Sequence, residues 1–527
     1  MFGSLSTFAN LPTQRKVDPK DIPPPTPINL PRYQPFADDG RAVDPSRSLP
    51  SLLAQTGRSP GVLGPLGFAA IGLDLKSDAA IDDLIPNSVF IPNFSQWNNL
   101  TPDEARDRNQ ATRRLLRTGN LSPGCQVYLE RRKELSNVNE DAFRTVRRIP
   151  PPKGKQQPRL GNAYEFFRCL ELFTTYWDDP SRPASLPPSP ELSAAEAETA
   201  DNSEGPQPGE IENGDAPSIA RVSSGQSMPA EFRHTLVAAF VKLVAYDFGC
   251  NVSMSRVEPR LQLKSLDGPR QRKTYTPCHC HFVFQSPLTR ETARAGLVYG
   301  PVAAVSSRPT VDFTSPNVET AQCLDLAREV IAALVTAQHR AREGKTETRF
   351  GDGQWWTFKP RWGGGTGGPI GREIDKFAVS EDKDERTDGG DNIPGPATKK
   401  LRKNMSIYDN YRMVRPPASS WDRKARYEAI GMVRDASHDD VYVISSLFHH
   451  ISVLRVRVPR RLLEVLDGSP EPDPSSRSWG KVEAWRSPWY DLFVTDQRIG
   501  AMELLWSVMA YQMRQDTAQE DVTMAEA

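Results

Sequence analysis

The residues best equipped for chemistry lie in residues 276–284, TPCHCHFVF, where Cys278, His279, Cys280 and His281 follow one another. Thiolate and imidazole groups are zinc ligands, and together they also form the nucleophile and base of thiol catalysis. In an extended strand, however, successive side chains point to opposite faces, so the two cysteines share one face and the two histidines the other. A single strand therefore does not present all four groups to one tetrahedral ion.

The spacing of these cysteines also differs from that of structural zinc sites. Such sites take ligand pairs, with about two to four residues between partners, from two places in the chain. Here one residue separates Cys278 from Cys280, and no C-x-x-C pair occurs, so Cys250, Cys323 or His339 would have to complete a site. The pattern favours a strand whose cysteines point inward as small apolar residues. We therefore predict no cofactor and no metal ligand, with a metal or thiol site around this stretch as the alternative.

Two further patterns are assigned no site. The glycines of residues 362–371, WGGGTGGPIG, invite comparison with a phosphate-binding loop, which lies between a strand and a helix and commonly ends in Lys-Ser or Lys-Thr. No lysine follows these glycines at the required place, and Pro369 interrupts them, so we predict a hinge. His449 and His450 are expected to face opposite ways in a strand, and no role is assigned to them.

A compact basic cluster is the most informative short motif. Lys399, Lys400, Arg402 and Lys403 lie in PATKKLRKN, shortly after a strongly charged stretch. Exposed basic clusters of about five to eight residues are typical of nuclear import signals or nucleic-acid contacts. The setting favours import, which makes a nuclear import receptor a predicted partner. A solvated run of charge is the alternative interpretation.

The composition bounds the class of protein. Lysine plus arginine and aspartate plus glutamate each number 66 among 527 residues, so no overall charge draws the chain to nucleic acid or a membrane. The 47 prolines and the apolar share of 38% indicate folded modules separated by extended segments. Six widely spaced cysteines are not a disulfide framework and favour a reducing compartment. No apolar run reaches the about 18 residues that a membrane-spanning helix needs, so no membrane partner is expected.

Shifts in composition divide the chain into seven regions. Proline-rich sequence favours extended chain without internal hydrogen bonds, and acidic sequence with few large apolar residues cannot offset its chain entropy by burial. The predicted order is an extended Pro-rich N-terminal region (1–92), a mainly helical segment (93–180), a disordered acidic linker (181–228), an α+β module (229–343), a Gly-rich and charged flexible loop with the basic cluster (344–404), a second α+β module (405–515) and an acidic tail (516–527).

Two helices are predicted in the helical segment. The first begins at Thr101, where Pro102 and Glu104 complete a capping box, and ends at Gly119. Its many arginines form either a solvated face or a basic face for an acidic partner or nucleic acid. The second covers residues 162–179, where aromatic residues recur at helical spacing and indicate a stripe that faces the core.

Each module combines helices with strands. In residues 229–343, a buried helix precedes a hairpin with an Asp267-Gly268 turn, and a long amphipathic helix closes the module. In residues 405–515, a short helix from Ser420 precedes two strands in DDVYVISSLFHHISVLRVRV, a helix in PRRLLEVLDG and a closing helix. The predicted class is α+β: two small mixed modules of helices and antiparallel sheet, or one discontinuous body, with long disordered Pro, Ser and acidic segments.

The absence of a recognisable catalytic constellation, together with long polar segments that join folded modules, favours a protein that binds other proteins. We expect a non-enzymatic adaptor or scaffold of the nucleus that acts in transcription or chromatin regulation, as part of a nuclear complex. A nucleic-acid-binding protein that uses basic stripes at residues 106–117 and 144–159 is one alternative. An enzyme with a site assembled around residues 278–281 is another, and the cytoplasm is the alternative location.

Overall fold

The computed structural model describes the folded part of the chain in several stretches. They are residues 18–22, 46–56, 60–176, 228–253, 260–265, 272–278, 280–285, 297–308, 318–343, 426–433, 436–473 and 475–515, together with Ile28, Leu30, Pro31, Tyr33 and Asp44. The predictions for residues 181–227, 344–404 and 516–527 lie outside these stretches, and so do Lys399, Lys400, Arg402 and Lys403 of the basic cluster.

In the described residues, nine strands form one mixed sheet. Its main path is β1 (Leu73–Lys76), β10 (Val482–Arg486), β9 (His450–Pro459), β8 (His438–Leu447), β6 (Leu297–Ser307), β5 (Cys280–Gln285) and β2 (Cys250–Ser253), while β11 (Tyr490–Asp491) pairs with β9 and β7 (Arg426–Glu428) with β6. The pairs β1–β10, β6–β8 and β6–β7 are parallel, and the remaining pairs are antiparallel. The α+β class is confirmed, but the sheet is mixed where antiparallel pairing was expected.

The two predicted modules share this sheet. Strand β6 comes from residues 229–343 and β8 from residues 405–515, and they lie side by side in parallel register with Ala304 opposite Val443. Strand β8 is buried along almost its whole length, as befits a central strand covered on both faces. The sequence allowed either two separate modules or one discontinuous body. The described residues form one discontinuous body.

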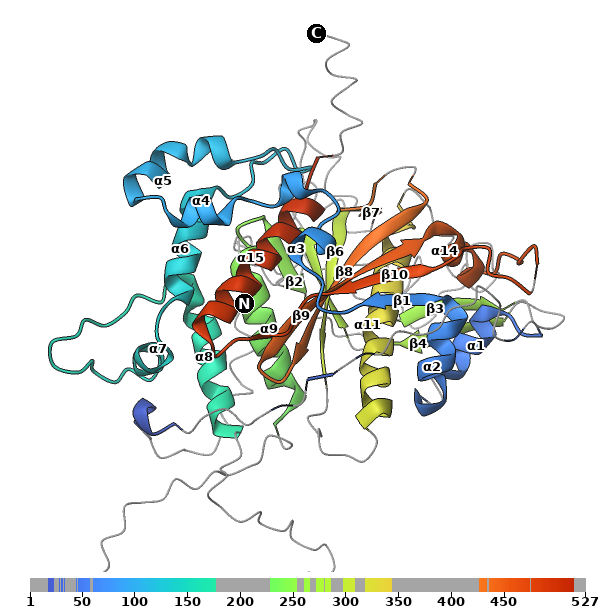
Figure 1. Cartoon of the computed structure of the whole chain (residues 1–527), viewed down its shortest axis with the longest axis horizontal. Coiled ribbons are helices and arrows are strands. Elements are labelled where there is room, and N and C mark those ends of the chain that lie inside the picture. The colour runs from blue at the N-terminus through green and yellow to red at the C-terminus, as the bar shows by residue number, and fades with distance from the viewer. Residues whose placement is uncertain are drawn as a thin grey trace, which may run out of the picture.

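Helices cover both faces of the sheet (Figure 1). One face carries the elements α3 (Ile81–Leu84), α4 (Phe94–Asn98), α5 (Pro102–Arg108), α6 (Cys125–Leu135), α7 (Asn139–Val146), α8 (Tyr164–Phe173), α9 (Ala230–Ala245) and α15 (Thr495–Gln512). The other carries α1 (Leu49–Thr56), α2 (Pro60–Ile71), α11 (Val318–Arg340), α14 (Arg460–Leu466) and the hairpin of β3 (Arg260–Ser265) and β4 (Arg272–Pro277). Short 3-10 helices are η1 (Pro19–Asp21), η2 (Ser88–Phe90), η3 (Gln110–Thr112), η4 (Gly161–Ala163) and η5 (Thr174–Tyr176).

Apolar periodicity predicted the core-facing helices well. The aromatic stripe of α8 is buried against α9, with the ring centroids of Phe166 and Phe240 5.4 Å apart. Helices α9, α11, α14 and α15, strands β8 and β9, and the β3–β4 hairpin all lie where expected. In α15, successive turns bury Met502, Trp506 and Met509 against the first face of the sheet.

Residues 49–92 differ from the extended conformation expected for the N-terminal region. They contain α1, α2, β1 and α3, and Leu53, Phe68 and Leu73 are buried in the core beneath α11 and α14. Strand β1 adds a parallel edge to the main sheet beside β10. The apolar residues scattered among the prolines here are sufficient to dock this part of the chain on the body.

The helix that begins at Thr101 has the predicted capping box but is shorter than predicted. Glu104 accepts a hydrogen bond from the Thr101 backbone N–H (2.9 Å), and the Glu104 N–H donates to Thr101 Oγ1 (3.4 Å). The helix ends at Arg108, and residues 113–122 form a loop in which Gly119 has φ +79°. The stretch has too few apolar residues to bury a longer helical face.

The short helix expected from Ser420 is also wrong over its described part. Residues Arg426–Glu428 form strand β7, which pairs with β6, and Gly431 follows with φ +86°. A β carbon on Gly431 would lie 1.8 Å from Gln512 Oε1, so this position requires glycine for space as well as for conformation. Long-range pairing with β6 overrides the local helical pattern here.

Candidate functional site

The Cys/His stretch bends between two sheets. Strand β4 ends at Pro277, β5 begins at Cys280, and the Cys280 N–H donates to the Cys278 carbonyl (2.9 Å). Both thiols are buried in the core beside α11, and Cys278 Sγ donates to the carbonyl of Arg328 (3.5 Å). His281 faces the other way, with its ring 4.2 Å from that of His234. The prediction of inward cysteines is confirmed, although the stretch is not one straight strand; His279 lies outside the described residues.

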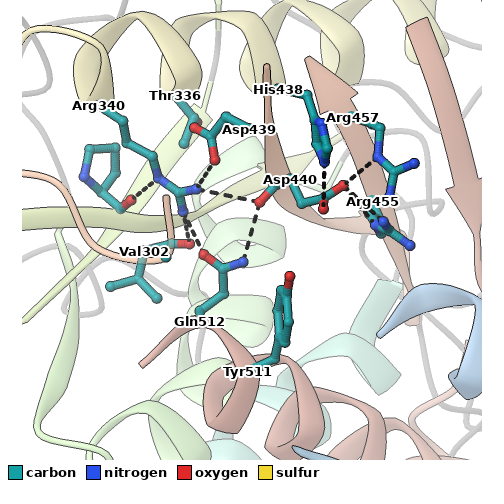
Figure 2. Close-up of polar contacts among 12 residues, drawn as sticks. Val302, Thr336, Arg340, His438, Asp439, Asp440, Arg455, Arg457, Tyr511 and Gln512 are labelled. Carbon is teal, nitrogen blue, oxygen red and sulfur yellow. Dashed lines mark hydrogen bonds and ion pairs between the residues drawn. The ribbon is translucent and has the colours of Figure 1, made fainter. Parts of the chain in front are cut away.

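A dense polar cluster lies where β8 begins and α11 and α15 end (Figure 2). The Arg340 guanidinium, fully buried, is its centre. Its five N–H groups donate to the carbonyls of Pro301 (2.7 Å), Val302 (2.5 Å) and Asp440 (3.4 Å) and to Asp439 Oδ1 (3.0 Å) and Gln512 Oε1 (2.8 Å). Beside it, the Asp440 carboxylate pairs with Arg455 (2.9 Å) and Arg457 (3.3 Å).

This network is structural. The Arg340 guanidinium has no donor left for a ligand, and its acceptors come from both halves of the discontinuous body. Burial raises the pKa of Asp439 and Arg340 opposes that change, as expected for a carboxylate held in the interior by one strong partner. The cluster therefore ties β6, β8, α11 and α15 together rather than forming a binding site.

A second polar cluster lies at the opposite end of the strands, where β6 and β8 finish. Ser306, Ser307 and Ser446 line it together with the ion pair between Arg308 and Asp325 (2.6 Å). Burial raises the pKa of the Asp325 carboxyl to about 6. Ligands of α/β proteins commonly bind at such carboxyl ends of parallel strands.

Two residues of the N-terminal region close this cluster. Pro31 and Tyr33 line its cavity of about 20 Å³, which has room for about one water molecule. The Arg486 guanidinium lies 4.9 Å from the centroid of the Tyr33 ring and forms an ion pair with Glu329. The body thus already binds a proline-containing segment of its own chain at this edge.

A larger pocket lies between α4, α15 and the loop of residues 111–123. Its volume is about 270 Å³. The side chains that line it are mainly aromatic and apolar, and they are Val89, Phe90, Ile91, Pro92, Asn93, Trp97, Ala111, Thr112, Arg114, Ser122, Pro123, Phe248, Trp506 and Ala510. The Trp506 ring stands edge-on to Phe248 at 5.5 Å and to Tyr128 at 5.7 Å, which fixes its orientation in the wall.

Arg114 provides the charge of this pocket. Its guanidinium lies 5.6 Å from the centroid of the Phe90 ring, and among the described residues no carboxylate pairs with it. The backbone of Arg114 is fixed because its N–H donates to Ser122 Oγ (2.9 Å) and its carbonyl accepts from the Ser122 N–H (2.7 Å). A pocket with aromatic walls and one free guanidinium suits a planar or apolar group next to a negative charge.

The basic residues that were predicted to lie on one helix lie partly on α5 and partly in the loop that follows it. Arg106 is exposed on α5 and pairs with Asp103 (3.4 Å), whereas Arg114 and Arg117 lie in the following loop. Arg117 pairs with Glu343 at the end of α11 (3.5 Å). These arginines therefore do not form one continuous basic helical face, which was one of the two interpretations of the sequence, and Arg114 lies at the aromatic pocket.

Sequence reasoning missed both the pocket and a group of possible metal ligands. The pocket combines residues 89–123 with Phe248 and α15, and no local motif marks such a combination. Among the described residues, His449, His450 and Asp491 form one group with ligand atoms close enough to hold a metal ion. In the sequence, the adjacent residues His449 and His450 were the signal that could have indicated this group.

Comparison with known proteins gives no relative. No protein-family model matches the sequence, and no significant match occurs among curated proteins or solved structures. Of the helices that the structure describes, none combines the length and apolar character required to cross a membrane.

Proposed function

We propose that this chain is a non-enzymatic nuclear adaptor or scaffold that binds other proteins in transcription or chromatin regulation. The observation that carries the proposal is the aromatic pocket of about 270 Å³ with Arg114 at its side, which pairs with no carboxylate among the described residues. Protein interfaces take most of their affinity from a few aromatic or arginine anchors in well-packed pockets. The expected ligand is a partner segment that inserts an apolar or aromatic side chain and places an acidic residue beside Arg114.

The N-terminal region supports a protein-binding function. Ile22 and Ile28 pack on the core, and Pro31 and Tyr33 line the small polar cavity beside Arg486. Short proline-containing segments bind with little loss of chain entropy because they are already extended. The same body that holds its own segment in this way is suited to hold a segment of another protein.

Nuclear location rests on the basic cluster. Changing Lys399, Lys400, Arg402 and Lys403 together to alanine should move a fluorescently tagged full-length protein from the nucleus to the cytoplasm, because the import receptor loses its charged contacts. Fluorescence microscopy of living cells measures the ratio of the two pools. Charge-conserving changes to arginine or lysine at the same positions are the control, and an unmodified protein that is already cytoplasmic contradicts the proposal.

Binding of single-stranded nucleic acid is the second candidate function. Aromatic rings stack on bases without strong sequence preference, and an arginine beside them contacts the phosphate. Trp97, Phe90 and Arg114 offer both groups in one pocket. This candidate predicts affinity that falls steeply with salt. The enzyme alternative around residues 278–281 draws less support, because Cys278 and Cys280 are buried thiols of the core.

Blocking the pocket should abolish partner binding without unfolding the protein. Ala510→Phe places a ring inside the cavity, and Arg114→Glu reverses the charge beside it. We expect recovery of protein partners in an affinity purification with nuclease treatment to fall at least about tenfold for either variant, since one lost anchor costs about 2 kcal/mol or more. Mass spectrometry with isotope labels measures the ratio to the unmodified chain.

Arg106→Glu is the matched control for this experiment. Arg106 is an exposed arginine on the neighbouring helix α5, outside the pocket lining, and the charge change is the same. Its partners should be recovered in unchanged amounts. Equal recovery with all three variants would contradict the pocket as the binding site, and loss of a labelled oligonucleotide instead of proteins would favour the nucleic-acid alternative.

A further inference from the structure

Two adjacent histidines and an aspartate converge at the end of the hairpin formed by β8 and β9. Asp491 on β11 lies directly opposite His450 in the antiparallel pairing of β11 with β9. His450 Nε2 is 3.9 Å from Asp491 Oδ2, and His449 Nε2 is 3.6 Å from Asp491 Oδ1. One ligand atom from each of the three residues falls within 4.8 Å of the other two.

We propose that His449, His450 and Asp491 bind a divalent transition metal ion, with zinc as the best fit. Zinc in proteins accepts imidazole nitrogen and carboxylate oxygen at about 2.0–2.2 Å, so tetrahedral ligand atoms stand about 3.4 Å apart. The two imidazole nitrogens lie 3.6 and 3.9 Å from different oxygens of the Asp491 carboxylate. One ligand atom from each residue lies within 4.8 Å of the others, so side-chain rotation and contraction would gather the three around one ion. Two imidazoles and one carboxylate leave a fourth position for water or a partner's group.

The hairpin turn brings the two histidines together. In a straight strand, two adjacent side chains point to opposite faces. The turn between β8 and β9 instead places the ring centroids of His449 and His450 4.3 Å apart. Phe448, the residue before them, has φ +52°, a left-handed conformation that is uncommon for a bulky side chain. Such a conformation persists where the surroundings dictate it, and here Phe173 and His449 pack on the Phe448 ring.

Backbone contacts orient the carboxylate independently of any metal. The Phe493 N–H donates to Asp491 Oδ1 (2.8 Å), and the Asp491 N–H donates to Gln497 Oε1 (2.7 Å). The Leu492 N–H donates to the His449 carbonyl (3.1 Å), which joins the two ligand-bearing loops. Fixed outer contacts of this kind are what metal sites use to hold their ligands in place.

The surroundings leave the carboxylate available to an ion. Arg498 interacts electrostatically with Asp491, but its guanidinium donates to the carbonyls of Leu135 (2.7 Å), Asn137 (2.6 Å) and Leu492 (3.3 Å). The His449 side chain is buried, while those of His450 and Asp491 are 14% and 17% exposed, so an ion reaches the group from one side. A bound ion would clamp the β8–β9 turn to β11, and this inference does not depend on the proposed function.

The test is a zinc titration of the full-length protein after treatment with a chelator. Isothermal calorimetry should show one zinc ion per chain, and the midpoint of thermal unfolding should rise when zinc is added. Asp491→Asn and His450→Gln, which nearly preserve side-chain size, should each weaken zinc binding on the order of 100-fold, since a lost ligand costs at least as much as a lost outer contact. Far-UV circular dichroism verifies that both variants fold.

Two controls separate this site from the rest of the chain. His438→Gln changes a histidine at the other end of β8, near Asp440, and should leave zinc affinity unchanged. Cys278→Ala with Cys280→Ala tests the cysteines of the β4–β5 bend and should also leave it unchanged. The inference is overturned if the unmodified protein neither binds zinc nor gains stability with it, or if Asp491→Asn and His450→Gln bind zinc as the unmodified protein does.

Discussion

Replacing Arg340 with methionine is expected to lower the free energy of unfolding by about 3–5 kcal/mol, the cost of breaking a buried ion pair from one side. Methionine retains most of the apolar volume but leaves Asp439 buried without its cation. The carbonyls of Pro301 and Val302 and the amide of Gln512 also lose their donors. Urea denaturation followed by circular dichroism measures the change, with the slope of the transition expected to stay constant.

A matched pair of variants makes the Arg340 result interpretable. Arg106→Met removes an exposed ion pair with Asp103 and should change stability by less than about 1 kcal/mol. Arg340→Met combined with Asp439→Leu removes both buried charges and should recover part of the loss. A loss below about 1 kcal/mol for Arg340→Met would show that the network is not the structural tie between the two halves.

Separating the two halves of the chain is expected to have the largest effect of all. Fragments 1–343 and 405–527, expressed alone, should be unfolded or insoluble, and co-expressed they should form a soluble complex. The first fragment alone would leave β6 without β8 and Arg340 without Asp439. The second would leave β10 without β1 and the faces of β8 and β9 without the cover of α11. An exposed apolar strand edge of this kind promotes aggregation.

Co-purification through a tag on one fragment, followed by size-exclusion chromatography, measures this assembly. A co-expressed pair that carries Arg106→Met in the first fragment is the control, since that residue is exposed on α5 and should not affect recovery. Fragments that are each soluble, show cooperative unfolding and do not associate would contradict the single discontinuous body. They would support the two separate modules that the sequence also allowed.

Local signals in the sequence predicted most elements near the core. The capping residues Thr101 and Glu104 marked a helix start correctly, and the apolar alternation around Leu454 and Val456 identified β9. These signals succeed because each depends on neighbours within one turn or one strand. The first helix is shorter than predicted because its stretch has too few apolar residues to bury a longer helical face. The helix expected from Ser420 was wrong because pairing with β6, far away in the chain, decides the conformation of Arg426–Glu428.

Long-range geometry explains why the candidate sites were not predicted. The aromatic pocket combines Trp97 with Phe248 and Trp506, three residues without a common motif. His449 and His450 were expected on opposite faces because adjacent side chains alternate in a straight strand. The chain turns at Phe448, so the alternation does not apply and the two rings lie close together. Their third partner, Asp491, becomes visible only through the register of β11 with β9.

Binding of another protein at the aromatic pocket can be detected by site-specific photocrosslinking in cells. A photoreactive phenylalanine analogue at Val89 lies at the pocket, where this side chain is 59% exposed, and the same analogue at Val138, 61% exposed and outside the pocket lining, is the control. We expect discrete protein adducts from position 89 and none of them from position 138. Absence of protein adducts at 89, identical adducts at both positions, or adducts with nucleic acid alone would contradict it.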